Sequence, residues 1–163
     1  MLRVSATVNV YFSSKVVSYT LSDCQSVAVY LATIGRDIDL EINRLMSERQ
    51  TMAGNILDTI GSMAIIQTLS QLRTDVREAV KIQGFQTTRH YSPGYCDWDI
   101  RQQRIIFSVL GSNTLKVTLN EACSMIPRKS ISGIIGIGIP DKQKQSPCGL
   151  FCLKSATCEY RNL

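Results

Sequence analysis

The sequence predicts an α+β fold with an antiparallel sheet, and three observations lead to this prediction. Segments of strand type lie before and after long helical segments instead of alternating with them. The chain has 163 residues, which is the length of one domain. Its hydrophobic fraction of 44% and charged fraction of 19% are ordinary for a folded protein and too apolar for a disordered one.

The N-terminal part of the chain is expected to contribute three strands. Residues 4–12 alternate between apolar and polar side chains, as a half-buried strand does. A short turn then leads into a second strand over residues 16–21, so the chain opens with a predicted hairpin. Residues 26–33 are more continuously apolar and form a third strand, which Gly35 closes.

Two helices follow these strands. Asp37 is expected to cap the first helix. Residues 51–83 repeat apolar side chains at steps of three and four, which predicts a long second helix. Gly61 lies inside this helix, where glycine costs about 1 kcal/mol relative to alanine. A glycine there indicates either close packing or a bound ligand, and packing is the commoner reason.

The C-terminal half is expected to hold one more helix and two more strands. Asp97 or Asp99 caps the helix, and Gly111 ends it. Residues 115–119 alternate as a strand, and residues 131–139 form the last strand. The sequence is then polar and finally rich in cysteine. We therefore expect a domain of residues 1–140 with a C-terminal tail of residues 141–163.

Charge and hydropathy disfavour two classes of partner. The net charge of +5 comes from scattered basic residues, whereas nucleic-acid binding calls for a basic stripe with interleaved aromatic residues. No run approaches the ~18 apolar residues of a membrane span. The N-terminus also lacks the pattern of a signal peptide. We expect a cytoplasmic protein that binds neither nucleic acid nor membrane.

Two short runs do not have the pattern of core elements. Residues 89–95 place a Pro-Gly turn between aromatic residues, which is typical of a rigid loop that offers backbone amides to a ligand. Residues 119–133 leave one strand, cross Pro127 and enter the next strand through Ser-x-Ser-Gly. Brought together by a helix and a sheet, these runs predict a cleft for a flat polar ligand.

In these runs the sequence resembles the activation (reactivation) domain of vitamin B12-dependent methionine synthase, and more closely the stand-alone anaerobic relatives of that domain. A further matching run, residues 56–62, lies on the long helix, and the resemblance extends from about residue 16 to the C-terminus. The residues that carry it, in chain order, are Ser92, Pro93, Gly94, Tyr95, Asp97, Trp98, Gln103, Leu119, Glu121, Met125, Pro127, Ser130, Ser132 and Gly133.

This resemblance implies a curved antiparallel sheet flanked by helices, with S-adenosylmethionine bound in a shallow groove. It also implies a cobalamin-binding methyltransferase protein as partner, and a reductase or other electron donor. The domain would then be an accessory component of methionine biosynthesis. It would serve the reductive methylation of inactive Co(II) cobalamin, with the cobalt chemistry on the partner.

The resemblance also implies which residues form the site. Tyr95 is expected near the methyl group and the corrin, as the residue closest to the chemistry; alternatively it anchors the loop in the core. Glu121 is expected to shape the groove floor; alternatively it caps a helix or pairs with Arg128 or Lys129. The cofactor-binding residues are expected to be Arg89, His90, Tyr91, Ser92, Pro93, Gly94, Tyr95, Glu121, Pro127, Ser130, Ser132 and Gly133.

Two positions depart from the family pattern. His90 stands where the family has an arginine, and Ile66 stands where the family's long helix has a glutamate. These changes support a second hypothesis, a non-catalytic metal-binding module for corrinoid docking or electron transfer that has lost S-adenosylmethionine binding. An enzyme of unrelated chemistry is a weaker alternative, because the sequence offers no acid/base pair for it.

The C-terminal tail holds three of the six cysteines. Cys148, Cys152 and Cys158, with Cys123 as a fourth ligand, are expected to hold zinc or an iron–sulfur cluster. An iron–sulfur cluster would suit a protein that works beside a cobalt in need of an electron. Free thiols are the alternative.

Overall fold

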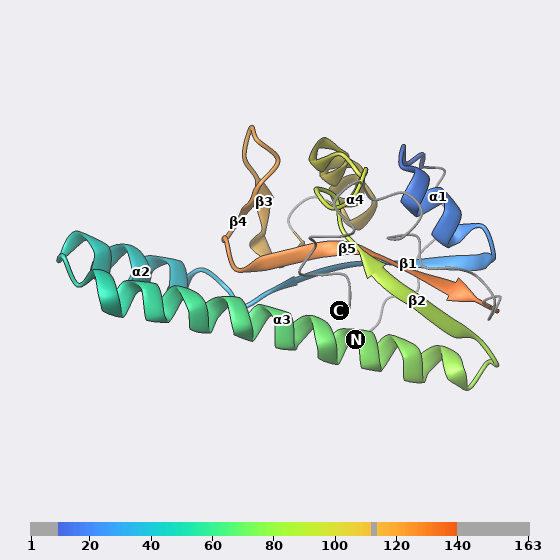
Figure 1. Ribbon diagram of the computed structural model, residues 1–163, viewed down its shortest axis with the longest axis horizontal. Helices are drawn as coiled ribbons and strands as arrows, with labels where there is room; N and C mark the ends of the chain where they lie inside the picture. The colour runs from blue at the N-terminus through green and yellow to red at the C-terminus, as the bar shows by residue number, and fades with distance from the viewer. Residues whose placement is uncertain (1–9, 112–113, 140–163) are drawn as a thin grey trace.

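The computed structural model describes residues 10–111 and 114–139, which form a three-stranded antiparallel sheet with helices on both faces (Figure 1). The strand order is β1-β5-β2. A separate two-stranded pair joins β3 to β4. The strands are β1 (Cys24–Thr33), β2 (Gln86–Tyr91), β3 (Thr118–Leu119), β4 (Met125–Ile126) and β5 (Ser130–Gly138). The predicted α+β class with an antiparallel sheet is confirmed.

The helices cover the two faces of the sheet unequally. One long helix lies along one face, and two short helices lie on the other (Figure 1). A further helix, α2, packs against the first half of the long helix. The helices are α1 (Lys15–Leu21), α2 (Asp37–Ser47), the long α3 (Thr51–Lys81) and α4 (Gln103–Leu110), with single 3-10 turns at η1 (Ile100–Gln102) and η2 (Thr114–Lys116).

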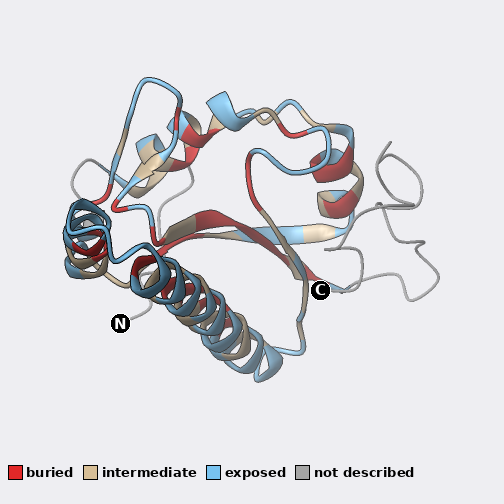
Figure 2. Ribbon diagram, turned by 60° about the vertical axis from the view of Figure 1, so that its left-hand side comes forward, coloured by how far each residue is buried: buried red, intermediate tan, exposed pale blue. Residues whose placement is uncertain are grey.

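Successive residues of the central strand β5 serve two different core layers. Ile134 packs with residues of α1 and α4, and Ile135 packs with residues of β1 and α3; both are almost wholly buried. Figure 2 shows buried segments on the sheet and on the helices that cover it. The first layer is Val17, Trp98, Ile106 and Ile134, and the second is Tyr30, Leu69, Val76 and Ile135. Burying one large apolar side chain stabilises a fold by roughly 1.5–3 kcal/mol. The sheet is therefore held from both faces.

The strand predicted over residues 16–21 is wrong, because these residues form helix α1. Ser14 caps this helix by accepting a hydrogen bond from the amide of Val17 (3.1 Å). The carboxylate of Asp97 accepts three more bonds, from the Ser14 hydroxyl (2.7 Å), the Lys15 amide (2.6 Å) and the Val16 amide (3.3 Å). Asp97 therefore caps α1, and Asp99 caps η1 by accepting from the amide of Arg101 (2.8 Å).

Two further strand predictions differ from the structure. Within residues 115–119 only Thr118–Leu119 is a strand, because Leu115 and Lys116 have left-handed φ angles of 58° and 55°. Residues 10–12 of the predicted first strand are not in a strand, and residues 4–9 lie outside the described part of the chain. The tail of residues 141–163 also lies outside it.

Candidate functional site

The loop after β2 is closed by hydrogen bonds between its own backbone groups. The amide of Gly94 donates to the carbonyl of Trp98 (2.7 Å), and the amide of Tyr95 donates to the carbonyl of Ser92 (3.3 Å). Gly94 has a φ of 94°, a conformation that favours glycine. Trp98 is 2% exposed and packs edge-on against Phe12, with ring centroids 5.1 Å apart. The amides of Gly94 and Tyr95 are therefore used within the loop, and its rigidity stays a prediction.

Arg89, His90 and Tyr91 lie in strand β2 and not in this loop. Tyr91 packs toward the core layer of α1 and α4, so its neighbour His90 points to the face covered by α3. Burial, with smaller effects from the cations of Arg73 and Arg89, lowers the pKa of His90. Its buried Nδ1 has no hydrogen-bond partner among the described residues.

The two runs that were predicted to form a site, residues 89–95 and 119–133, meet beside His90. Ser92 lies against Tyr30 of β1, with 3.2 Å between their hydroxyl oxygens, and both side chains are buried. A Cβ on Gly133 would overlap the carbonyl oxygen of Tyr91 and would lie 2.7 Å from the Tyr30 hydroxyl. A glycine at position 133 is therefore what allows the two runs to approach so closely.

We call Tyr30, Arg73, His90, Ser92 and Gly133 the loop cluster. Burial raises the pKa of Tyr30 to about 12, although the hydrogen bond with Ser92 and the positive charge of Arg73 oppose the change. At neutral pH the cluster thus holds a neutral phenol and a neutral imidazole, and the guanidinium of Arg73 is near enough to act on both. Such a mixture can bind a small molecule that carries a carboxylate and an amino group.

Tyr95 lies at the rim of the loop cluster and is 52% exposed. Its alternative role as the aromatic anchor of the loop is wrong, because the buried Trp98 fills that role. Pro93 is buried and Gly94 is exposed beside it. An exposed phenol at the edge of this loop is placed to contact a ligand or a partner surface.

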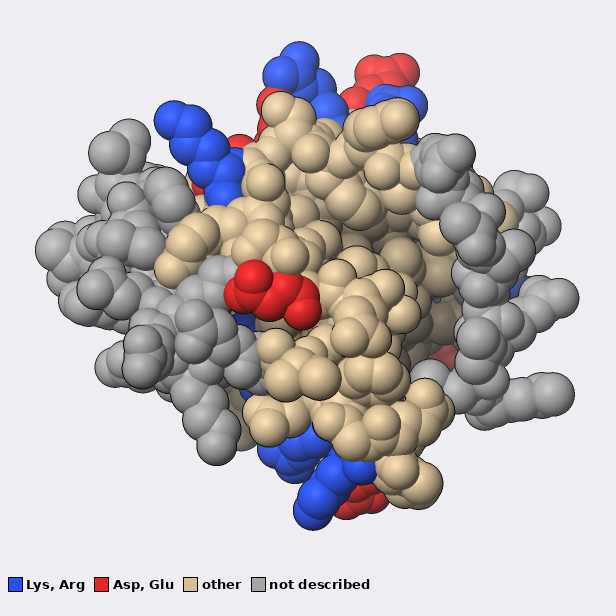
Figure 3. All heavy atoms as spheres, turned by 90° about the vertical axis from the view of Figure 1, so that its right-hand side faces the viewer, with Lys and Arg blue, Asp and Glu red and all other residues tan. Residues whose placement is uncertain are grey.

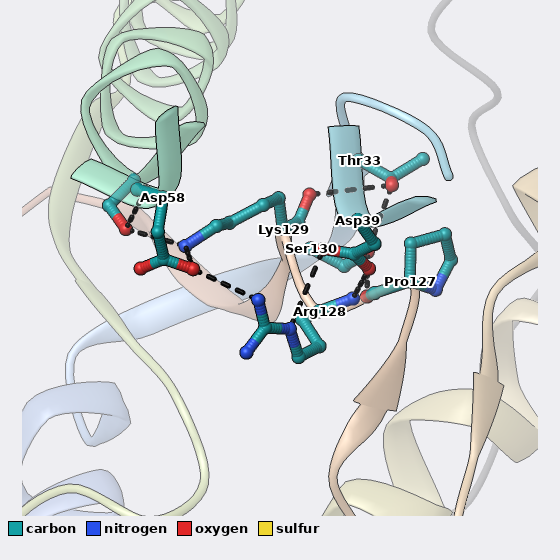
Figure 4. Close-up of polar contacts among 8 residues, drawn as sticks. Thr33, Asp39, Asp58, Pro127, Arg128, Lys129 and Ser130 are labelled. Atoms are coloured by element: carbon teal, nitrogen blue, oxygen red, sulfur yellow. Dashed lines mark hydrogen bonds and ion pairs between the residues drawn. The ribbon is translucent and has the colours of Figure 1, made fainter. Parts of the chain in front are cut away.

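A second polar group of residues lies where the crossing from β4 enters β5 (Figure 4). Lys129 is only 8% exposed, and its Nζ donates to the Ser62 hydroxyl (2.8 Å) and pairs with Asp58 (3.0 Å). Arg128 pairs with the same Asp58 (2.9 Å) and, through its backbone amide, donates to Asp39 (2.7 Å). We call these five residues the junction network, which ties α2, α3 and β5 together.

Other predicted residues belong to this junction and not to the loop cluster. The Ser130 hydroxyl donates to the carbonyl of Pro127 (2.7 Å), and its oxygen lies 2.9 Å from the Thr33 hydroxyl. Ser132 belongs to neither group: it lies on the same side of β5 as Ile134, it is 1% exposed, and its hydroxyl has no partner within the described residues. A Cβ on Gly61 would lie 3.1 Å from Cε of Lys129, so this glycine serves close packing.

Glu121 lies apart from both groups. Arg128 and Lys129 pair with Asp58, which excludes the alternative pairing with Glu121. The Glu121 side chain is exposed, and its backbone carbonyl accepts a long hydrogen bond from Arg104 (3.4 Å). Its predicted role in a groove floor stays a prediction.

The four-cysteine site also stays a prediction. Cys123 is 1% exposed, and its Sγ accepts a hydrogen bond from Nε of Arg104 (3.2 Å). The other three predicted ligands, Cys148, Cys152 and Cys158, lie outside the described residues. Within residues 10–111 and 114–139, no three His, Cys, Asp or Glu side chains gather as a metal site would require.

Two surface hollows lie away from the loop cluster. One is lined by residues at the start of α1 and by Asp97, and the other lies between the end of α3 and the start of β2. Figure 3 faces the right-hand side of Figure 1 and shows lysine and arginine side chains toward the upper and lower edges of this end, with mostly uncharged side chains and one acidic group between them. None of the described helices has the length and apolar character needed to cross a membrane.

The sequence reasoning missed two members of the loop cluster, Tyr30 and Arg73. Each carries a weak signal: Tyr30 is a phenol inside an otherwise apolar strand, and Arg73 adjoins the apolar face of a helix. The sequence matches neither a protein-family model nor a curated protein.

Proposed function

We propose that the chain is an accessory module of the methionine synthase activation-domain type, which binds S-adenosylmethionine at the loop cluster and docks on a cobalamin-carrying methyltransferase. One observation carries the proposal. Ser92 and Gly133, which belong to the two separate runs that carry the resemblance, lie against each other at the α3 face of the sheet. They meet beside a buried imidazole nitrogen with no partner among the described residues.

The residues of the loop cluster fit part of this ligand. The guanidinium of Arg73 suits the carboxylate of the methionyl group. The imidazole of His90, kept neutral by its lowered pKa, offers a buried nitrogen that can accept from the amino group. The exposed phenol of Tyr95 offers a π face to a sulfonium or an adenine ring. This accounts for each charged end of the ligand with a named side chain.

The work of this chain would be positioning. S-adenosylmethionine supplies an electrophilic methyl group, and the cobalt that accepts it belongs to the partner. A loop closed by its own hydrogen bonds, with Tyr95 at its rim, would hold that methyl group at a fixed place on the docking surface. The single guanidinium of the cluster, Arg73, would orient the opposite end of the ligand.

Anaerobic calorimetry with S-adenosylmethionine tests the proposal. Wild-type protein should bind with micromolar affinity, and Arg73→Ala should weaken binding by roughly tenfold or more because a charge-assisted contact is lost. Arg77→Ala, an exposed arginine one turn further along α3, is the matched control and should bind as wild type does. No binding by the wild-type protein would overturn the proposal.

The second candidate is a docking or electron-transfer module that holds a metal and no S-adenosylmethionine. The observation that favours it is Ile66, which stands where the resembled family has a ligand-binding glutamate. Its apolar side chain is 57% exposed on α3, whereas Ile65 and Leu69 of the same helix are buried, so this position offers no polar group to the loop cluster. Metal content and the visible spectrum of protein purified without oxygen decide between the two. Stoichiometric iron or zinc without S-adenosylmethionine binding would favour this module.

A further inference from the structure

The outer side of α3 carries a row of exposed apolar side chains. Figure 2 shows this side of the helix as exposed surface facing away from the sheet. With 3.6 residues per turn, the members of the row fall within about one third of the helix circumference, opposite the buried Gly61, Ile65 and Leu69. Their exposed fractions are 78% for Met52, 55% for Ile56, 53% for Ile60, 66% for Met63 and 57% for Ile66. We call these five residues the α3 stripe.

The surroundings of the α3 stripe are almost without charge. Between Gln50 and Leu72 the sequence has a single charged residue, Asp58, and its carboxylate already pairs with Arg128 and Lys129. An exposed helix face in a folded protein ordinarily carries charged side chains. The missing charge and the exposed methionines and isoleucines together mark an interaction surface.

The spacing of the α3 stripe is complementary to itself. A two-fold axis between Thr59 and Ile60 would set Ile56 of one copy against the partner's Met63, and Ile60 against the partner's Thr59. The same axis would bring Met52 beside the partner's Ile66. Two antiparallel helices related in this way bury identical patches, which is the arrangement of a symmetric dimer.

The available area agrees with this arrangement. The five side chains present on the order of 600 Å² of apolar surface in each copy, the upper end of what a monomer exposes in one patch. Adding the polar residues that flank them approaches the roughly 800 Å² per partner of a standard interface. We propose that the α3 stripe is the interface of an antiparallel homodimer, in which the α3 helices of two copies pack against each other.

This interface would leave the loop cluster free. The stripe points away from the sheet, whereas His90 and Tyr30 lie on the side of α3 that covers the sheet. The dimer therefore neither requires nor blocks the proposed ligand site. Its test is independent of S-adenosylmethionine binding.

Size-exclusion chromatography with light scattering tests the proposal on the full chain. At about 100 µM, where an interface of standard size is well populated, wild-type protein should have the mass of two chains. Ile56→Glu should weaken association at least about 100-fold, because it buries a carboxylate in an apolar contact. Ile82→Glu is the matched control: Ile82 is 90% exposed but lies beyond the stripe, so this variant should remain a dimer.

Mixing two variants tests the antiparallel register. Ile56→Glu and Met63→Lys should each be monomeric alone, because each places like charges in the interface. Mixed in equal amounts, they should recover the mass of two chains, because the new carboxylate of one copy meets the new ammonium of the other. Circular dichroism confirms that each variant folds, as exposed positions allow.

Three outcomes would overturn the proposal. Wild-type protein with the mass of one chain at about 100 µM would contradict the dimer. If that monomer binds lipid vesicles, the α3 stripe is a membrane-binding surface instead. A dimer that persists in Ile56→Glu would show that the interface lies elsewhere on the molecule. Failure of the mixed variants to associate would exclude the antiparallel register.

Discussion

The loop cluster and the junction network both lie against α3, yet they differ in how their polar groups are satisfied. In the junction network each cation has a carboxylate partner, with Asp58 2.9 Å from Arg128 and 3.0 Å from Lys129. In the loop cluster the buried Nδ1 of His90 has neither a hydrogen bond nor an ion pair among the described residues. The buried Oδ1 of Asp39 in the junction network also lacks a hydrogen bond, but it lies 3.6 Å from the cationic Nε of Arg128. A paired charge holds the fold together, whereas a buried polar atom without a partner is available to a ligand.

Residues that were predicted from the sequence to form one site therefore fall into two structural groups. Ser130 and Pro127 belong to the crossing that the junction network fixes, and Ser92 and His90 belong to the loop cluster. Substitutions in the network should therefore change stability alone. Substitutions in the loop cluster should change ligand affinity as well.

Gly133→Ala should have the largest effect, because it breaks the loop cluster at its tightest point. The new methyl group would overlap the Tyr91 carbonyl and lie 2.7 Å from the Tyr30 hydroxyl, so the strand and loop must separate. We expect the free energy of unfolding in urea to fall by about 3 kcal/mol, near the top of the range for overpacking.

Gly84→Ala is the control for Gly133→Ala. A Cβ at Gly84 has no atom within 4 Å, but its φ of 80° is strained for alanine, so a loss of about 1 kcal/mol is expected. Equal losses in the two variants would show that position 133 is not tightly packed. The contact between the two runs would then lose its support.

Asp58→Asn should have the next largest effect, because it breaks the junction network. The Lys129 ammonium, 8% exposed, would lose its carboxylate and keep only the Ser62 hydroxyl; the expected loss is about 2 kcal/mol. Glu48→Gln breaks an exposed ion pair with Arg44 and should leave the unfolding midpoint unchanged. If both variants lose the same free energy of unfolding, the junction network contributes no more to stability than an exposed ion pair does.

The same carboxylate gives a pH dependence with a defined sign. The hydrogen bond from Lys129, followed by the charges of Lys129 and Arg128, lowers the pKa of Asp58. The stabilisation is therefore complete above the ordinary aspartate pKa of about 3.9 and is lost as the pH falls through the lowered value. Unfolding measured between pH 6 and about pH 3 should show a smaller acid loss in Asp58→Asn than in wild type.

Regular periodicity made the long elements predictable. Helix α3 was predicted over residues 51–83 and spans Thr51–Lys81, and the central strand was predicted over residues 131–139 and spans Ser130–Gly138. Helix α1 could not be predicted, because one of its caps is the carboxylate of Asp97, 82 residues from Lys15. Strand β2 was missed because it is polar and lies at a sheet edge.

The site was predictable only where its residues carry a motif. His90, Ser92 and Gly133 were expected to lie together, and the structure brings them to one face of the sheet. Tyr30 faces them because β1 pairs with β5 in a register that sets Tyr30 opposite Gly133. That register follows from the packing of the whole sheet, so local sequence could not reveal it.

Tyr30→Phe removes the hydroxyl that lies against Ser92 in the loop cluster. Losing the hydroxyl leaves Ser92 without its buried partner, which should cost about 1 kcal/mol at neutral pH. Burial raises the pKa of Tyr30 from 10.0 to about 12, so its contribution is complete below pH 10 and is lost as the pH rises toward 12. Urea unfolding at pH 9 and pH 11 should show a smaller alkaline loss in the variant. An equal alkaline loss in both proteins would mean that Tyr30 is not buried.

Asp97→Asn should cause the smallest loss of stability, and it tests whether a loop residue outside the loop cluster affects ligand binding. Burial would raise the pKa of Asp97, but hydrogen bonds from Ser14, Lys15 and Val16 lower it overall, so this cap also weakens as the pH falls through that lowered value. Because asparagine keeps one acceptor oxygen, the expected loss in the free energy of unfolding is about 0.5–1 kcal/mol, typical of a helix cap.

Asp75→Asn is the control: it changes an exposed carboxylate on α3 and should cost nothing measurable by urea unfolding. Affinity for S-adenosylmethionine should be unchanged in both variants, since Asp97 points to α1 and not to the loop cluster. A loss of affinity in Asp97→Asn alone would mean that the capped start of α1, and not the contact between Ser92 and Gly133, positions the ligand.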